Sequence, residues 1–399
     1  MATVLCVWEL GTDLGHLSNL RLAIEVALRM GHQVVLAARE LHRARDVFGD
    51  MPITYLQAPF KQFTVRGEQS NYQSYTHLIA QQCFSDSGEL RMYLAAWRGL
   101  FELTRPAVVL FEHSPTALIA AHDFSFAKII VGNGFTVPTH GNSEGQPFVP
   151  FPTTPRTPQS YAQLVMDDMR LLACINHSLK SMGLTEIGSL ATLYAQADAR
   201  FLMTWPELDH LGPRVGSSYL GIEPPSPRAK PLWPKGGGSK VFGYLHAIPA
   251  LELLLQALAA QPVCALLFVR YLPPVLRARY TSDFLQFIDN PVDLSKVSEQ
   301  AAWVINLGNH STAATFALAG VPQLLIPLHQ EHLFLTTRLV SQGAAAMAFQ
   351  DQVGYTNAID VMQNSPQLQA EAQQLAHQLT PYADLHAADF IGRTFASLI

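Results

Sequence analysis

The amino-acid sequence predicts an α/β protein that contains two doubly wound, Rossmann-like domains. Short apolar runs alternate with amphipathic helical segments along the 399 residues, as in parallel sheets covered by helices. The alternation stops at a segment rich in proline and glycine and then starts again, so the pattern occurs twice. Hydrophobic residues make up 49% of the chain and charged residues only 14%, which supports a large buried core and excludes a disordered polyelectrolyte.

The first forty residues carry the pattern of a strand, a loop, a helix and a second strand. Residues Thr3–Trp8 form an apolar run that predicts a buried parallel strand, and a loop with Gly11 and Gly15 follows. Apolar side chains then recur at helical spacing as far as Gly31, which stands where a helix C-terminal glycine is expected. Residues 33–37 form the next apolar run, and a right-handed crossover makes the two strands parallel.

The alternation continues through the rest of the first half. Between residues 134 and 158 the sequence has no periodicity and many prolines, so it predicts a long surface loop of a kind that is often functional. Phe148, Phe151 and Tyr161 beside this loop either line a pocket or tether the loop. The other expected elements are helices at 90–101, 116–122 and 161–177 and strands at 107–111, 128–131 and 200–203.

The clearest domain boundary lies at residues 223–239. Pro224-Pro225-Ser226-Pro227 and Gly236-Gly237-Gly238-Ser239 interrupt the pattern there. We expect an N-terminal domain over residues 1–222, this linker, a C-terminal domain over residues 240–370, and closing helices over residues 371–399. In the second half the expected strands are 240–244, 263–268, 303–307, 323–326 and 345–349, and the expected helices are 250–260, one starting at Ser311, and 331–342.

Charge, cysteine content and hydropathy exclude several classes of protein. The net charge of −5 argues against a nucleic-acid-binding surface. The four cysteines are isolated and lack metal-ligand spacing, so neither a disulfide framework nor a zinc site is expected. The first residues resemble a strand more than a signal peptide, and no stretch approaches the roughly 20 apolar residues of a membrane span. We therefore expect a cytoplasmic protein without a transmembrane segment; peripheral membrane contact stays open.

A turn of small residues follows the expected strand at 303–307 and opens a helix. Its sequence is Gly308-Asn309-His310-Ser311-Thr312. Small residues let backbone N–H groups approach a phosphate, and the helix N-terminus adds a partial positive charge. The turn therefore predicts a phosphate site, although Ser311 and Thr312 equally suit a plain helix N-cap.

The residues after this turn extend the pattern with Gly320-Val321-Pro322 and Glu331-His332. With them, residues 240–350 resemble the inverting glycosyltransferases of the GT-B fold, specifically the UDP- or dTDP-sugar-dependent family that includes plant and antibiotic glycosyltransferases. The resemblance implies two Rossmann-like domains that face a central cleft and a last helix that crosses back to the N-terminal domain. It also implies that residues 308–312 bind the donor diphosphate and that Glu331 and His332 bind the donor sugar.

Three positions depart from the family pattern. The family's phosphate-binding histidine would fall at Leu307, its ribose-binding glutamate would fall at Thr315, and His332 replaces its usual glutamine. His310 lies beside the helix N-terminus and is a candidate to take over the phosphate contact. His246, in the loop after the strand at 240–244, is a second candidate for that contact.

A candidate catalytic base lies in the first loop. In the family a Gly-His pair after the first strand supplies the base, and Gly15-His16 fits that position. Histidine titrates near neutrality and suits the removal of a proton from an acceptor hydroxyl. The resemblance places the orienting carboxylate at Glu112, directly after the strand at 107–111. Asp13 and His113 are alternative bases; in the non-catalytic alternative, His16 caps the first helix and Glu112 is a solvated loop carboxylate.

These observations predict a hexosyltransferase-type glycosyltransferase that moves a sugar from a UDP- or dTDP-sugar to an acceptor hydroxyl with inversion. The nucleotide sugar is a co-substrate, and neither a resident cofactor nor a metal ion is expected, because the turn and the helix dipole stabilise the leaving diphosphate. The acceptor is open, with an apolar small molecule or a lipid among the candidates. Two alternatives are a sugar-nucleotide epimerase on the same fold and a non-catalytic protein that binds sugar nucleotides or partner proteins.

Overall fold

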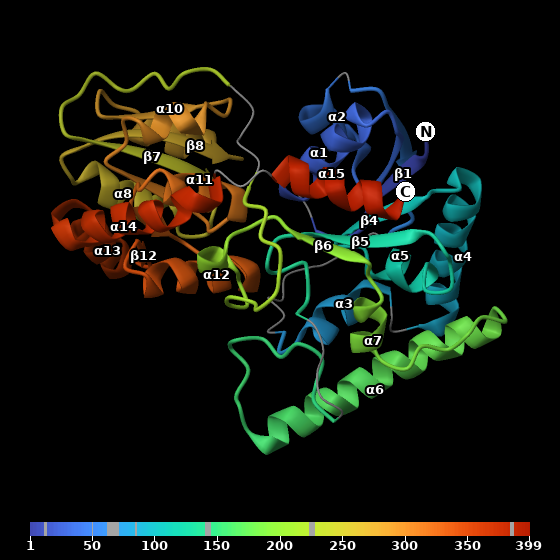
Figure 1. Cartoon of the computed structure of the whole chain (residues 1–399). Helices are drawn as coiled ribbons and strands as arrows, with labels where there is room; N and C mark the ends of the chain where they lie inside the picture. Colours follow the sequence, from blue (N-terminus) through green and yellow to red (C-terminus); the bar gives the residue numbers. More distant parts are fainter. Residues whose placement is uncertain are drawn as a thin grey trace. The chain divides into compact units, whose positions relative to one another are not determined.

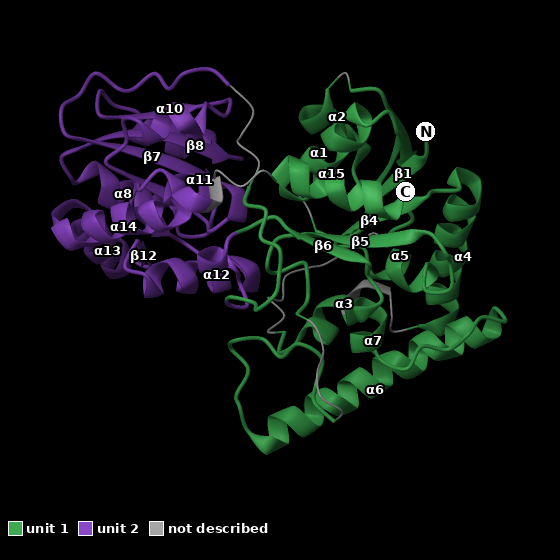
Figure 2. Cartoon of the chain, viewed as in Figure 1, with its two compact units in different colours: residues 1–204, 213–223, 386–399 green, residues 205–212, 224–385 purple. Residues whose placement is uncertain are grey.

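The computed structural model describes residues 1–11, 14–49, 51–61, 72–83, 86–139, 145–222, 228–383 and 387–399. In it the chain divides into two compact units (Figure 2). Unit 1 comprises residues 1–204, 213–223 and 386–399, and unit 2 comprises residues 205–212 and 224–385. The chain therefore passes between the units more than once.

Unit 1 is built on a six-stranded parallel sheet with the strand order β3-β2-β1-β4-β5-β6 (Figure 1). Its central strands are apolar and almost wholly buried, as expected for strands covered by helices on both faces. The strands are β1 (Thr3–Trp8), β2 (Gln33–Ala38), β3 (Ile53–Gln57), β4 (Val108–Glu112), β5 (Ala127–Gly132) and β6 (Ala199–Leu202). The helices are α1 (Leu14–Arg29), α2 (Leu41–Phe48), α3 (Tyr75–Cys83), α4 (Ser87–Thr104), α5 (Pro115–Ala120), α6 (Pro158–Ser181), α7 (Leu190–Ala195) and α15 (Ala387–Leu398).

The helix α15 completes the core of unit 1. Ile391 and Phe395 are fully buried among the side chains of β1, β2 and α1. Figure 1 shows α15 lying beside α1, and the two helices are in contact. The preceding helix α14 (Pro366–Ala383) instead packs on α11 (His310–Leu318) in unit 2. Of the closing helices, only α15 is thus part of unit 1.

The proline-rich region between residues 134 and 158 is only partly a surface loop where the structure describes it: residues 152–153 and 155–158 are exposed, but much of the rest is buried. Phe148, Val149 and Phe151 are buried, and the ring of Phe148 packs edge-on against Tyr75 at 5.9 Å. The Tyr75 N–H donates to the Val149 carbonyl at 3.0 Å, and the Phe151 N–H donates to the Gln73 carbonyl at 2.9 Å. The expectation of a surface loop is wrong for residues 147–151, because aromatic side chains tie them to the start of α3.

Unit 2 has a second six-stranded parallel sheet with the order β12-β11-β10-β7-β8-β9. Counted within each unit, both sheets have the same arrangement, in which the first strand lies between the second and the fourth. The strands are β7 (Ser239–His246), β8 (Val263–Arg270), β9 (Leu285–Ile288), β10 (Trp303–Asn306), β11 (Gln323–Leu325) and β12 (Ala345–Met347). The other helices are α8 (Leu251–Ala259), α9 (Pro274–Tyr280), α10 (Leu294–Ser298), α12 (Gln330–Ser341) and α13 (Gln352–Asn364).

A short segment from earlier in the chain, residues 205–212, packs into unit 2. It contains the 3₁₀ helix η1 (Pro206–Leu208), which contacts α12. The Gln342 side chain donates to the Glu207 carbonyl at 2.9 Å, and Arg338 donates to the Pro206 carbonyl at 3.4 Å. These bonds fix the segment on α12.

The predicted fold class is confirmed, since both units are doubly wound α/β sheets with parallel strands. The sequence did not indicate the edge strands β3 and β9. Among the described residues, no helix is both long and apolar enough to span a bilayer.

Candidate functional site

The candidate base of unit 1 lies at the point where the order of the strands reverses. In open α/β sheets, ligands bind at the carboxyl ends of the strands at such a switch point. Here the switch lies between β1 and β4, whose last residues Trp8 and Glu112 are paired across the sheet. His16 follows β1 in the first turns of α1. The topology therefore brings His16 and Glu112 together although 96 positions separate them in sequence.

His16 and Glu112 form a hydrogen-bonded pair. The His16 Nδ1 atom lies 2.8 Å from Oε2 and 3.0 Å from Oε1 of Glu112. The carboxylate is fully buried, and Asn19 Nδ2 also donates to Oε1 at 3.1 Å. An ionised carboxylate only accepts hydrogen bonds, so it holds the proton of the neutral imidazole on Nδ1. In this tautomer the basic nitrogen of His16 is Nε2. The alternative of a solvated Glu112 carboxylate is wrong.

Gly11 makes room for the basic edge of the His16 ring. Its φ is 84°, and a β-carbon on it would stand 1.9 Å from His16 Nε2. That distance is far below any contact between non-bonded atoms, so only glycine fits both the backbone conformation and the ring. The first loop is therefore shaped around this imidazole.

The His16 ring lies between two other aromatic rings. Trp8 and His113 both stack on it with ring centroids 5.7 Å away, at interplanar angles of 21° and 26°. His113 has a φ of 41°, in the left-handed region, and neither of its ring nitrogens has a hydrogen-bond partner among the described residues. Burial, with smaller effects of His16 and Arg39, lowers the pKa of His113 well below its usual value. His113 thus adds a neutral ring against His16. Asp13, the other alternative base, lies outside the described residues.

Glu9 is a second buried carboxyl group at this edge of the sheet, and the sequence reasoning missed it. Its Oε2 atom accepts hydrogen bonds from the backbone N–H groups of Thr116 at 3.0 Å and Ala117 at 3.4 Å. Burial raises the pKa of Glu9 to about 7, although these bonds and Arg39 oppose the shift. Its position directly after an apolar strand is the sequence signal that could have identified it.

The candidate phosphate turn of unit 2 lies at the corresponding switch point between β7 and β10. Asn306, the last residue of β10, is fully buried, and its Oδ1 accepts from the Gly308 N–H at 2.9 Å. Gly308 has a φ of 88°, and a β-carbon on it would lie 3.0 Å from the His332 carbonyl oxygen and 3.1 Å from Thr336 Oγ1. The turn is therefore tight, and it packs directly on α12.

The turn leads into α11 without a side-chain cap. Asn309 occupies the N-cap position, but its side chain accepts no hydrogen bond from the first turn, and its Oδ1 atom has no partner among the described residues. His310, the first residue of the helix, is buried, and burial lowers its pKa to about 4. Ser311 and Thr312 follow it in the first turn. The plain N-cap alternative thus lacks the side-chain bond that would define it.

The residues expected to bind the donor sugar lie at the start of α12. Glu331 is half-buried and His332 is buried, with its Nδ1 atom unpartnered within the described ranges. The His329 and His332 ring centroids are 3.7 Å apart. Burial, and then His329 and His246, lower the pKa of His332 well below its usual value, so a neutral imidazole stands there. The half-buried His246 ends β7 and acts electrostatically on His332.

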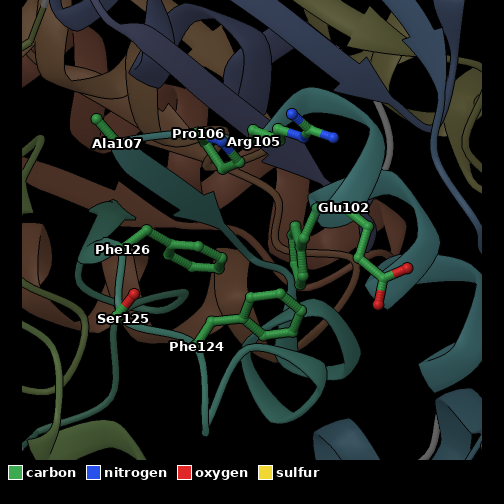
Figure 3. A pocket seen from close by; sticks show the side chains of 8 residues that line it. Glu102, Arg105, Pro106, Ala107, Phe124, Ser125 and Phe126 are labelled. Carbon is green, nitrogen blue, oxygen red and sulfur yellow. The ribbon is translucent and has the colours of Figure 1, made fainter.

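Two other features lie outside these clusters. The part of the chain that the structure describes contains no group of His, Cys, Asp and Glu residues arranged to hold a metal ion. A cavity of about 620 Å³ lies in unit 1 at the amino ends of β4 and β5, the opposite edge of the sheet from His16. Figure 3 shows the rings of Phe124 and Phe126 in its wall. None of the predicted site residues lines this cavity.

No family model matches the chain, and no curated protein matches it. Solved structures match it over nearly its whole length. Spinosyn rhamnosyltransferase SpnG complexed with thymidine diphosphate has a TM-score of 0.67 at 18% identity, with 99% of this chain and 100% of that one covered. The glycotransferase of kitacinnamycin has a TM-score of 0.68 at 16% identity, with 98% of each chain covered.

The chain has the GT-B fold. A further match is SnogD from Streptomyces nogalater, with a TM-score of 0.66 at 13% identity over 100% of this chain and 99% of that one. At these identities the similarity concerns the fold. The activity of this GT-B protein therefore has to be argued from its own side chains.

Proposed function

We propose that this chain is an inverting glycosyltransferase that moves a sugar from a nucleotide-diphosphate donor, UDP- or dTDP-linked, to an acceptor hydroxyl. The observation that carries the proposal is the buried Glu112 carboxylate, which receives the His16 Nδ1–H at 2.8 Å. A buried carboxylate that fixes the tautomer of an imidazole is the arrangement of a general base. The GT-B fold, shared with solved glycosyltransferases, adds support.

In this proposal His16 removes the acceptor proton. Nε2 takes the proton as the acceptor oxygen bonds to the anomeric carbon, and the bond from that carbon to the diphosphate oxygen breaks. Attack from the face opposite the leaving group inverts the anomeric configuration. The Glu112 carboxylate stabilises the imidazolium that forms, and the rings of Trp8 and His113 keep the imidazole in place.

The donor diphosphate is assigned to the turn at residues 308–312. Its small residues and the uncapped N-terminus of α11 offer backbone N–H groups and a partial positive charge, which stabilise the leaving diphosphate. Glu331 and His332 at the start of α12 are assigned to the donor-sugar hydroxyls. We further propose that SpnG, which was solved with thymidine diphosphate, indicates the class of nucleotide.

The release of nucleotide from UDP- and dTDP-sugars tests the proposal, with water taking the place of the unknown acceptor. We expect slow hydrolysis by the wild type and a rate about 10²–10⁴-fold lower for His16→Ala, with unchanged affinity for the nucleotide. The matched control is His177→Ala, an exposed histidine on α6. With methanol as the acceptor, proton NMR of the methyl glycoside should show inverted configuration, because a glycoside does not mutarotate as the free sugar does. Nucleotide binding with turnover that His16→Ala leaves unchanged would overturn the assignment.

A further inference from the structure

The segment at residues 205–212 places a second histidine at the start of α11. The rings of His210 and His310 lie with their centroids 5.4 Å apart, tilted by 32°. Both are buried, with 1% of His210 and 7% of His310 exposed. Two imidazoles that are distant in sequence thus meet at the first residue of the helix that follows the phosphate turn.

His210 is held there by the anchoring of its segment. The bonds from Gln342 and Arg338 to the carbonyls of Glu207 and Pro206 fix the segment on α12. The Asp209 carboxylate accepts the Leu211 N–H at 3.0 Å, which closes a local turn around His210. These hydrogen bonds therefore fix the position of His210 beside His310.

The same place carries independent signs of an anion site. The N-cap residue Asn309 accepts no hydrogen bond from the first turn of α11, and its Oδ1 atom has no partner among the described residues. His332, with 6% exposed, has an unpartnered Nδ1 atom among the described residues, and its backbone lines the Gly308 turn. Buried polar atoms without partners call for a ligand or water.

An imidazolium is disfavoured at this position when no anion is bound. Burial removes its hydration, and the positive end of the α11 dipole repels it. Burial alone lowers the pKa of His310 to about 4, so the ring is neutral near physiological pH. A bound diphosphate would reverse both effects. The charged and titratable groups on the elements packed around the two rings are Glu207, Asp209, Lys296, Glu331, His332, Arg338, Glu371 and His377.

We propose that His210 and His310 form a histidine pair that takes up a proton when the diphosphate of the donor binds. The inference rests on the proposed function, because it assigns a diphosphate to the turn at residues 308–312. The pair makes donor binding proton-linked, so the affinity for a nucleotide sugar rises as pH falls.

The size of the effect follows from linkage. If the bound pair regains an ordinary histidine pKa of about 6.5–7, about 0.7–0.9 proton is taken up per nucleotide sugar at about pH 6. The affinity is then about four- to tenfold higher at about pH 6 than at about pH 8.

The test is titration calorimetry of the full chain with UDP-glucose and dTDP-glucose in buffers of different ionisation enthalpy. The diphosphate of these compounds does not titrate near neutrality, so the uptake reports on the protein. We expect the wild type to take up about 0.7–0.9 proton per nucleotide sugar at about pH 6. His210→Asn and His310→Asn should each reduce the uptake to below about 0.2 proton and flatten the pH dependence of the affinity. The control His177→Asn should match the wild type.

The two proposals fail in different ways. Binding by the wild type with less than about 0.2 proton taken up, or wild-type uptake retained in both variants, would overturn the histidine pair and leave the glycosyltransferase assignment standing. A wild type that binds neither nucleotide sugar at any pH would overturn both. The wild-type measurement alone can overturn the inference, even if a variant fails to fold.

Discussion

Replacing Glu112 by Gln tests the catalytic pair with almost no change of volume. Glu112 accepts from His16 Nδ1 at 2.8 and 3.0 Å and from Asn19 at 3.1 Å, in a fully buried position. A charge-assisted bond is worth about 1.5–3 kcal/mol, so its loss alone lowers the rate about 10- to 100-fold. In addition, the new amide can donate to Nδ1, which moves the imidazole proton to Nε2 and removes the base. Together these effects lower kcat by about 10³–10⁴-fold.

The assay is nucleotide release under saturating donor, with nucleotide affinity measured separately by calorimetry. We expect kcat to fall and the affinity to stay unchanged, because Glu112 lies in unit 1 and the turn proposed to bind the diphosphate lies in unit 2. Glu102→Gln, an exposed glutamate on α4, is the matched control. A Glu112→Gln protein that folds and keeps kcat within about threefold of the wild type would refute the reasoning.

Three further predictions concern glycine positions and a buried acid. Gly11→Ala should lower turnover at least about 10²-fold without changing nucleotide affinity, since its β-carbon would displace the His16 ring; steady-state kinetics measure this. Gly308→Ala should weaken nucleotide binding and lower the free energy of unfolding by about 1–3 kcal/mol, because of its positive φ and its contact with His332; calorimetry and denaturant unfolding report both. Burial raises the pKa of Glu9 in the folded state from its ordinary value of 4.5 to about 7, so the free energy of unfolding should fall as pH rises from about 4.5 to about 7. Glu9→Gln should remove this slope in denaturant titrations.

These predictions have matched controls. Gly99→Ala and Gly237→Ala introduce a β-carbon where no atom lies within 4 Å, so neither should alter turnover or nucleotide affinity. Equal losses of turnover or nucleotide affinity in the controls and in the test variants would contradict the explanation that the added β-carbon displaces neighbouring atoms. If the unfolding free energy of Glu9→Gln retains the wild-type slope between about pH 4.5 and pH 7, another group titrates there.

The sequence predicts the central strands and the edge strands β6 and β12, but it misses the edge strands β3 and β9 for a physical reason. β1, β4 and β10 are covered on both faces, so they are continuous apolar runs that stand out. β3 and β9 lie at sheet edges and are only partly buried, so polar residues such as Gln57 and Gln286 interrupt them. Their strand character comes from pairing with a neighbour, which a local pattern does not contain.

Local sequence patterns also do not indicate contacts between residues that are far apart in the chain. Residues 205–212 resemble a short connection with a proline, and nothing in them indicates that they pack on α12. The proline-rich region from 134 to 158 has the composition of a surface loop, but part of it, including Phe148 and Phe151, is buried in contacts with distant residues. The sequence pattern locates the strands other than β3 and β9, and tertiary packing decides which residues meet at their ends.

For the candidate site, the expected residues of unit 1 required the resemblance as well as the pattern. The sequence places His16 after the first strand and Glu112 after another, but their 2.8 Å contact depends on the strand order. His210 had no local signal at all. Glu9 had one, because a carboxylate directly after an apolar strand reaches the ligand-binding edge of a parallel sheet.

The position of α15 has a consequence for biosynthesis. Residues 1–204 leave the ribosome before the whole of unit 2, whereas Ile391 and Phe395, which fill the apolar surface beside α1, are translated after it. This apolar surface of unit 1 therefore stays exposed until α15 is synthesised. Exposed apolar surface favours the binding of a chaperone to the nascent chain. Chaperones that cover this apolar surface until α15 is synthesised should therefore raise the yield of folded protein.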